Sequence, residues 1–224
     1  MSGPSGRMMP STWVLLIVSS VQLVLITSAA GQTVDQLLPH RVKLAVAEYR
    51  GKSAIKVVED ENVPNGEAYA VVKGTEFHNG TIEVELAGAP GPNAAPTARG
   101  FIGIAFRVKD DRFEYIYLRP TNGRADDQVR RNHSTQYSAF PDFDFARLRR
   151  ESPETYESYV DLEPGAWTHV RVVVDGTTAR LFVHGAQQPA LVVNDLKHGD
   201  SSGLVALWIG PGTEGYFAGL TIRR

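Results

Sequence analysis

The chain of 224 residues contains no cysteine. This absence excludes disulfide bonds, a thiol nucleophile, a cysteine-ligated zinc ion and a lipidated N-terminal cysteine. His-x-x-x-His, EF-hand, P-loop and Gly-x-Ser-x-Gly patterns are also absent, so catalysis by zinc or by a serine triad has no support. We therefore expect no cofactor. The pair Asn194 and Asp195 could hold a calcium ion, but a turn is the favoured alternative.

Neither sign of charge is in excess, because 23 Lys and Arg residues oppose 25 Asp and Glu residues. The net charge of −2 gives no reason to expect binding to nucleic acid or to an anionic membrane surface. Hydrophobic residues make up 42% of the chain and charged residues 21%, which excludes long disorder and a collagen-like chain.

Charge is nearly absent from the N-terminus, where Arg7 is the only charged residue before Asp35. An apolar run from Trp13 to Ile26 ends in small residues as far as Ala30, a pattern typical of a secretory signal. We expect residues 1–30 to be the signal peptide, residues 31–224 to be one domain, and the protein to be secreted or periplasmic. An uncleaved signal anchor is the alternative. The run is shorter than the roughly 20 residues of a membrane span, and none is expected in the mature chain.

Helical periodicity is scarce too, and only residues 34–38 and 145–150 could form a turn or two of helix. Period-2 alternation instead predicts strands over residues 43–49, 54–58, 68–72, 81–86, 101–108, 113–119, 168–174, 179–183, 191–193, 204–209 and 216–222. In the strand 101–108 we expect Ile102, Ile104, Phe106 and Val108 to share one face. Residues 88–98 are expected to form a flexible loop. The many short strands predict an all-β, two-sheet antiparallel jelly-roll sandwich.

One hairpin carries a resemblance to a known superfamily. Trp167-x-x-Val170 leads to a turn at Asp175-Gly176 and then to Leu181-Phe182-Val183-His184-Gly185. This hairpin resembles that of the concanavalin A-like, or laminin-G-like, jelly rolls. The resemblance implies their fold, but the superfamily includes lectins, glycosidases and adhesion modules, so it does not imply one function.

A second resemblance covers most of the mature chain. Three segments, 77–84 (Phe-x-x-Gly-Thr-Ile-Glu-Val), 99–107 and 115–119, resemble strands of the 3-keto-disaccharide hydrolase domain family. The resemblance implies a jelly roll that acts on sugars oxidised at carbon 3. No established catalytic residue of that family matches a position in this chain, so no catalytic role is carried over.

The segment 119–137 is unusually polar, with Ala125 and Val129 as its only aliphatic residues. Its basic residues are Arg rather than Lys, and Lys is absent between Lys109 and Lys197. Arg offers the planar two-pronged hydrogen bonding that suits recognition. We expect a connection of nearly 40 residues before the next strand, and loops of this length are often binding loops. The segment forms either a ligand site or an Arg–Asp network that pins the loop.

Strand parity predicts what this segment faces. With Ile116 and Leu118 in the core, Tyr115, Tyr117 and Arg119 share the opposite face. Aromatic rings can cover the C–H face of a sugar, while Arg and amide groups bind its hydroxyls. Core packing is the alternative for each aromatic residue. The predicted saccharide-binding residues are Tyr115, Tyr117, Arg119, Asn122, Arg124, Gln128, Arg130, Arg131, Gln136 and Trp208.

Four residues are candidate acids or bases. His133 could be a general base near neutral pH, with a structural role as the alternative. Glu157 could be a general acid if it is buried beside aromatic residues, and otherwise it forms salt bridges. Asp126 and Asp127 are adjacent and cannot both point the same way on an extended chain, so their alternative is salt bridging to nearby Arg residues.

Three classes of function follow. The first is a secreted enzyme that cleaves a glycosidic bond, either with paired carboxylates or by elimination beside a keto group, where one base and an oxyanion stabiliser suffice. The second is a non-catalytic, lectin-like carbohydrate-binding module, and the third is a structural or adhesion domain. We favour the enzyme, because a lone binding module usually accompanies a catalytic domain and none is expected here.

Overall fold

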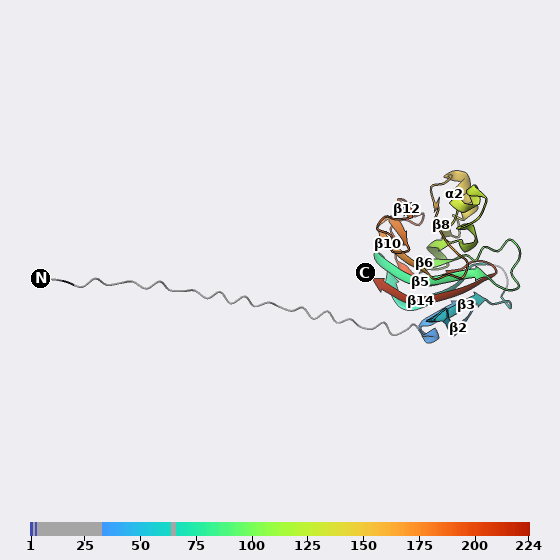
Figure 1. Cartoon of the computed structure of the whole chain (residues 1–224), viewed down its shortest axis with the longest axis horizontal. Helices are drawn as coiled ribbons and strands as arrows, with labels where there is room; N and C mark the ends of the chain where they lie inside the picture. Colours follow the sequence, from blue (N-terminus) through green and yellow to red (C-terminus); the bar gives the residue numbers. More distant parts are fainter. Residues whose placement is uncertain (2, 4–32, 64–65) are drawn as a thin grey trace.

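The computed structural model describes residues 1, 3, 33–63 and 66–224 of the chain. The expected signal segment, including the cleavage site after Ala30, lies outside the described residues apart from Met1 and Gly3. The described chain forms two antiparallel sheets of seven strands each, which confirms the predicted jelly-roll sandwich (Figure 1).

We call the two layers sheet A and sheet B. Sheet A has the strand order β1 (Leu37–His40), β4 (Ala68–Phe77), β13 (Gly203–Ile209), β6 (Ile102–Lys109), β7 (Arg112–Leu118), β8 (Thr135–Phe140) and β9 (Glu157–Ser158). Sheet B has the order β12 (Leu191–Val193), β11 (Thr178–Val183), β10 (Thr168–Asp175), β5 (Gly80–Pro90), β14 (Thr213–Arg223), β3 (Lys52–Glu59) and β2 (Val42–Tyr49).

Within the residues that the structure describes, helix is confined to short pieces. The α-helices are α1 (Gln128–Asn132) and α2 (Phe145–Glu151), and two 3-10 turns cover Val34–Gln36 and Pro120–Asn122. The side chains of Asp127 and Asp144 cap the two α-helices by accepting hydrogen bonds from the backbone N–H groups of Arg130 and Arg147. Figure 1 shows α2 beside β8 at one end of the domain, with β2 and β3 at the opposite end.

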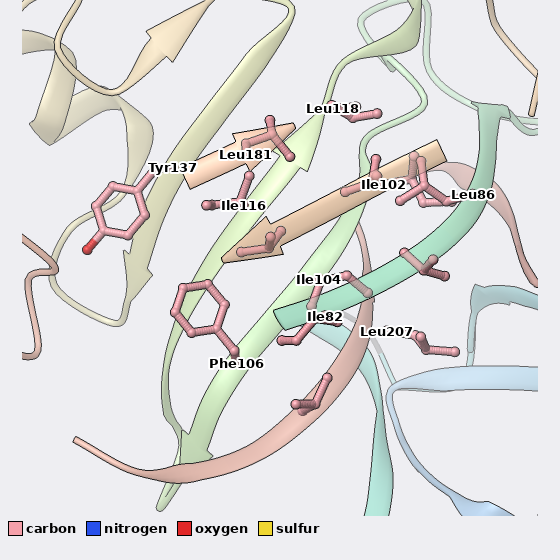
Figure 2. Close-up of a cluster of buried hydrophobic side chains, with 14 of the residues drawn as sticks. Ile82, Leu86, Ile102, Ile104, Phe106, Ile116, Leu118, Tyr137, Leu181 and Leu207 are labelled. Atoms are coloured by element: carbon pink, nitrogen blue, oxygen red, sulfur yellow. The ribbon is translucent and has the colours of Figure 1, made fainter. Parts of the chain in front are cut away.

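The main core lies between the sheets and follows the predicted alternation. Ile82, Val84 and Leu86 of β5 are all buried on one face. They belong to one core cluster with Ile102 and Ile104 of β6, and Figure 2 shows Ile82, Leu86, Ile102 and Ile104 between the strands. Each fully buried side chain of this size contributes about 1.5–3 kcal/mol to folding.

The prediction that Val108 shares the core face of β6 is wrong. Arg107 adopts a positive φ of 56°, and the pairing of β6 shifts register there. Such a bulge reverses the alternation of the residues that follow it. Val108 therefore lies on the outer face of sheet A, in a second cluster with Phe113 and Ala206.

The prediction of a connection of nearly 40 residues without a strand is also wrong. Residues Thr135–Phe140 form β8, which pairs with β7 along its whole length, from Phe113↔Phe140 to Leu118↔Thr135. The strand was missed because only Tyr137 and Ala139 face the core, while Gln136 and Ser138 are polar. The expected loop 88–98 is likewise shorter, because β5 continues to Pro90.

Candidate functional site

The candidate site is the outer face of sheet A, the face turned away from sheet B. Strand pairing aligns one residue from each strand in a single row across this face. Neighbouring strands lie about 4.8 Å apart, so a row across the sheet extends roughly 29 Å. The row consists of His40, Tyr69, Trp208, Gly103, Tyr117, Gln136 and Glu157.

Aromatic rings occupy the centre of the row. The ring of Trp208 lies 4.9 Å from that of Tyr117 and 5.0 Å from that of Tyr115, and the two tyrosine rings are stacked at 5.5 Å. Gly103 separates Trp208 from Tyr117, and a Cβ at Gly103 would lie 2.2 Å from the carbonyl oxygen of Ile116. The absence of a side chain there lets the two rings approach each other.

The parity prediction for this face is confirmed, because Tyr115, Tyr117 and Trp208 lie together on the outer side of sheet A. The rings are nevertheless only 6%, 3% and 4% exposed. They pack mainly against one another and against neighbours such as Phe101, so the core-packing alternative describes most of their surface. They form a rigid floor rather than an open platform.

Arg119 connects this floor to the polar end of the row. Its guanidinium donates to the Tyr117 hydroxyl at 3.1 Å, to Gln136 Oε1 at 2.9 Å and to Glu157 Oε1 at 2.7 Å. A further hydrogen bond reaches the carbonyl oxygen of His133 at 3.2 Å. The Arg119 and Glu157 side chains are only 4% and 3% exposed, so the network is held away from bulk water.

Glu157 is a buried carboxylate held by two guanidinium groups. Arg149, from α2, donates its Nε–H to Glu157 Oε2 at 2.9 Å, opposite the bond from Arg119. Burial acts to raise the pKa of Glu157, but the hydrogen bonds from Arg149 and Arg119 outweigh it and hold the pKa below 4.5. Glu157 is therefore ionised at neutral pH. A general acid must carry a proton, so the salt-bridging alternative describes this residue.

His133 faces a small cavity beside this carboxylate. The cavity has a volume of about 210 Å³ and is lined by Asn132, His133, Glu154, Glu157, Ser158 and Tyr159. Burial lowers the pKa of His133, and Arg149 and Arg119 lower it further against the opposing effect of Glu157. The imidazole is therefore neutral at pH 7, the form a general base requires. Its Nε2 lies 3.7 Å from Glu157 Oε2, beyond hydrogen-bonding distance.

The remaining predicted residues mostly hold the segment 119–137 together. Asn122 Nδ2 donates to the His133 carbonyl, and Arg130 Nε donates to Asn122 Oδ1. Arg131 Nε donates to the carbonyl of Ala125. These contacts match the alternative in which Arg residues pin the segment, although the partners are carbonyl and amide groups rather than aspartates.

Four predicted residues lie on the exposed surface of the same segment. Arg124 pairs with Asp161 and Glu163, and Gln128 donates to Asn132 Oδ1. Asp127 caps α1, and Asp126 is exposed beside it. The expected salt bridge from Asp127 to the side chain of an Arg is therefore replaced by a bond to the backbone N–H of Arg130. None of these four lines the cavity at His133.

Several residues of this face were not predicted. Arg149 and Tyr159 adjoin the cavity, and Glu67 accepts a hydrogen bond from the Trp208 indole at 2.6 Å. Burial raises the pKa of Glu67. Ser138 lies in register with Tyr115, and its hydroxyl is buried. Parity would have identified Ser138 once β8 was recognised, but Arg149 reaches Glu157 only through the tertiary fold.

Comparison with known proteins identifies the fold. No protein-family model matches the chain, and no curated protein matches it by sequence. Among solved structures, it resembles the carbohydrate-binding module CBM66 from Bacillus subtilis, with a TM-score of 0.57 and 10% identity over 84% of this chain and 96% of that one.

It also resembles a putative glycosyl hydrolase from Parabacteroides distasonis, with a TM-score of 0.51 and 10% identity over 84% of this chain and 93% of that one. A third similar structure is a Bacillus subtilis protein of unknown function with a galectin-like fold, with a TM-score of 0.51 and 10% identity over 85% and 92% of the two chains. At this identity the likeness establishes the fold alone, which is a two-sheet jelly-roll sandwich. The narrower resemblance to the 3-keto-disaccharide hydrolase domain stays a prediction.

Within residues 1, 3, 33–63 and 66–224, no group of three or more His, Asp or Glu side chains is placed to hold a metal ion. In that same part of the chain, no helix is long and apolar enough to cross a membrane. The side chains that line the cavity supply the imidazole of His133, the carboxylates of Glu154 and Glu157, the amide of Asn132, the hydroxyl of Ser158 and the ring of Tyr159.

Proposed function

We propose that the chain binds a saccharide at the cavity of His133 and cleaves a glycosidic bond there, with His133 as the base. The observation that carries this proposal is the neutral imidazole of His133 in a cavity beside the ionised Glu157. The kinship of fold with a carbohydrate-binding module and a putative glycosyl hydrolase supports a saccharide as the ligand.

The protonation states favour elimination over acid-assisted hydrolysis. Hydrogen bonds from Arg149 and Arg119 keep the pKa of Glu157 low, so this carboxylate has no proton to give to a leaving group. In a sugar with a ketone at carbon 3, the hydrogen at carbon 2 is acidic, and neutral His133 can remove it. The electron pair of that C–H bond forms a double bond between carbons 1 and 2 as the glycosidic C–O bond breaks. The imidazolium then returns its proton to the departing oxygen.

Other residues of the cavity have roles in this chemistry. The Asn132 side chain carries amide N–H groups that can donate to the ketone oxygen as negative charge develops on it. Tyr159 is exposed at the rim of the cavity, where its ring can cover the C–H face of a sugar. Arg119 and Asn122 both donate to the His133 carbonyl and so fix the backbone that carries the imidazole.

Replacement of the base tests the proposal directly. Purified His133→Ala protein and the unchanged protein would be assayed against 3-keto glycosides and ordinary glycosides, with product detection. We expect turnover to fall by about 10²–10⁴-fold, the range for loss of a general base. The matched control is His184→Ala, because His184 is an exposed histidine outside the cavity. An unchanged rate in His133→Ala, where the starting activity is measurable, would refute the assignment.

A non-catalytic binding module is the second candidate. It is favoured by the fact that both oxygens of Glu157 are already held by arginine donors, which suits a rigid recognition surface. In this case no sugar would turn over, but calorimetry would detect binding that is lost in Tyr159→Ala. Export after cleavage at Ala30 is expected for both candidate functions, because in each the protein would meet its saccharide outside the cytoplasm.

A further inference from the structure

The edges of the two sheets differ in how well they are protected from pairing with another chain. In sheet A, edge strand β1 has four residues and contains Pro39, and edge strand β9 has two residues. In sheet B, edge strand β12 has three residues, whereas the opposite edge strand β2 has eight. Natural sheets protect long edges with proline, bulges or inward charges, because unpaired main-chain groups template another strand.

Among the described edges, β2 is the longest, and Lys43 and Glu48 are its only charged residues. Its sequence contains neither proline nor glycine, and it pairs with β3 without a register shift from Val42↔Glu59 to Tyr49↔Lys52. Val46 is 64% exposed although it lies within this strand. Figure 1 shows β2 along the border of the domain farthest from β8 and α2.

We propose that β2 pairs antiparallel with β2 of a second copy of this chain, so that the two B sheets join into one continuous sheet. A two-fold axis perpendicular to the sheet generates this arrangement, and the same strand then serves as both halves of the interface. The occupant of the edge is a second copy because the strand is self-complementary in one register.

The direction of the main-chain groups selects that register. The N–H of Asp60 donates to the carbonyl of Arg41, so this pair is a hydrogen-bonded pair between the β2 and β3 segments. Hydrogen-bonded and non-hydrogen-bonded pairs alternate along an antiparallel ladder. The main-chain groups of Val42, Leu44, Val46 and Glu48 therefore point away from β3. All four find partners among themselves only when the two-fold axis passes through Ala45, which pairs Val42 with Glu48 and Leu44 with Val46.

The side chains fit the same register. On one face, the exposed Val46 of each copy meets Leu44 of the other, and this contact removes apolar surface from water. On the other face, the small side chains of Ala45 meet at the axis, and Lys43 lies opposite Ala47. No residue of like charge lies opposite another, so the pairing carries no direct repulsion.

The lack of cysteine in the chain allows a clean test of the register. In the Ala45→Cys variant of the exported chain, the two introduced thiols would face each other in a non-hydrogen-bonded pair, about 4.5 Å apart at Cα. This distance permits a disulfide. In the matched variant Ala47→Cys, the two positions would lie about 14 Å apart along the strands, too far to bridge. We expect a covalent dimer under mild oxidation for Ala45→Cys alone.

Sedimentation equilibrium over a concentration series tests the dimer without a cross-link. We expect the unchanged chain to dimerise reversibly and Val46→Lys to raise the dissociation constant at least tenfold. The control is Val192→Lys, which changes the same residue type on β12, the opposite edge of sheet B, where Val192 is 39% exposed. This control should change the dissociation constant less than twofold.

Three results would overturn the proposal. A chain that stays monomeric at all concentrations would show that β2 does not pair with a second copy. A dimer weakened by Val192→Lys and not by Val46→Lys would place the interface at β12. Cross-linking of Ala47→Cys in preference to Ala45→Cys would exclude the register centred on Ala45.

Discussion

Removal of the Arg119 side chain is the most informative perturbation of the candidate site. The guanidinium donates to four different groups, of which the Glu157 carboxylate is buried with it. In Arg119→Ala, the carboxylate keeps only Arg149, whose side chain is 39% exposed. Loss of one partner from a buried ion pair costs about 3–5 kcal/mol, because the remaining charge is left without compensation. By contrast, Arg149→Ala removes a partly solvated partner and should cost about 1 kcal/mol.

Urea denaturation followed by circular dichroism measures this difference. With a slope of about 2 kcal/mol per molar urea, a loss of 4 kcal/mol lowers the midpoint by roughly 2 M. The double variant Arg119→Ala, Glu157→Gln removes the stranded charge, so it should be more stable than Arg119→Ala alone. If Arg119→Ala lowered stability by less than 1 kcal/mol, or if Glu157→Gln gave no recovery, the reasoning from a buried charge pair would be refuted.

The same ion pair predicts a pH dependence with a defined sign. The pKa of Glu157 in the folded chain lies below its ordinary value of 4.5. A carboxyl with a depressed folded pKa stabilises the fold fully above the unfolded pKa and loses that contribution as pH falls through the folded pKa. The stability difference between the unchanged chain and Glu157→Gln should therefore be constant above about pH 5.5 and shrink below pH 4.5.

Three further predictions concern other parts of the chain. Burial raises the pKa of Glu114, which lies on the core side of β7, so its ionisation opposes folding as pH rises above 4.5. In urea melts, Glu114→Gln should therefore remove this loss of stability at pH values above 4.5. Gly103→Ala would place a Cβ 2.2 Å from the Ile116 carbonyl oxygen, and we expect a loss of about 1–3 kcal/mol in the same assay. Intact-mass measurement of the exported protein should show a chain that begins after Ala30, and a species that retains Met1 would contradict the signal prediction.

The segment 119–137 shows which features of a site can be predicted from local sequence. Strand parity placed Tyr115, Tyr117 and Arg119 on one face correctly, because alternation is a property of the strand itself. No feature of the sequence indicated that Arg119 would form an ion pair with Glu157, which lies 38 residues away in the chain. A residue's state of ionisation depends on burial and neighbours, and both arise only when distant segments meet.

The sequence by itself determined the sandwich. Its alternating strands each have one apolar face, such as Ile82, Val84 and Leu86, and two such sheets can bury those faces only against each other. The hairpin at Asp175-Gly176 also formed where its turn residues predicted it. These features depend on residues close in the sequence, so they can be recognised without knowledge of the partner strands.

The tertiary structure alone decided the register and the site. The bulge at Arg107 turned Val108 to the outer face, and β8 became a strand despite its polar residues because β7 offered a full ladder of partners. The row across sheet A combines residues from strands that are far apart in the chain, from Tyr69 to Trp208. Such alignment is set by pairing between strands and not by the order of residues within them. In the same way, His133 and Glu157 lie beside each other only in the folded chain.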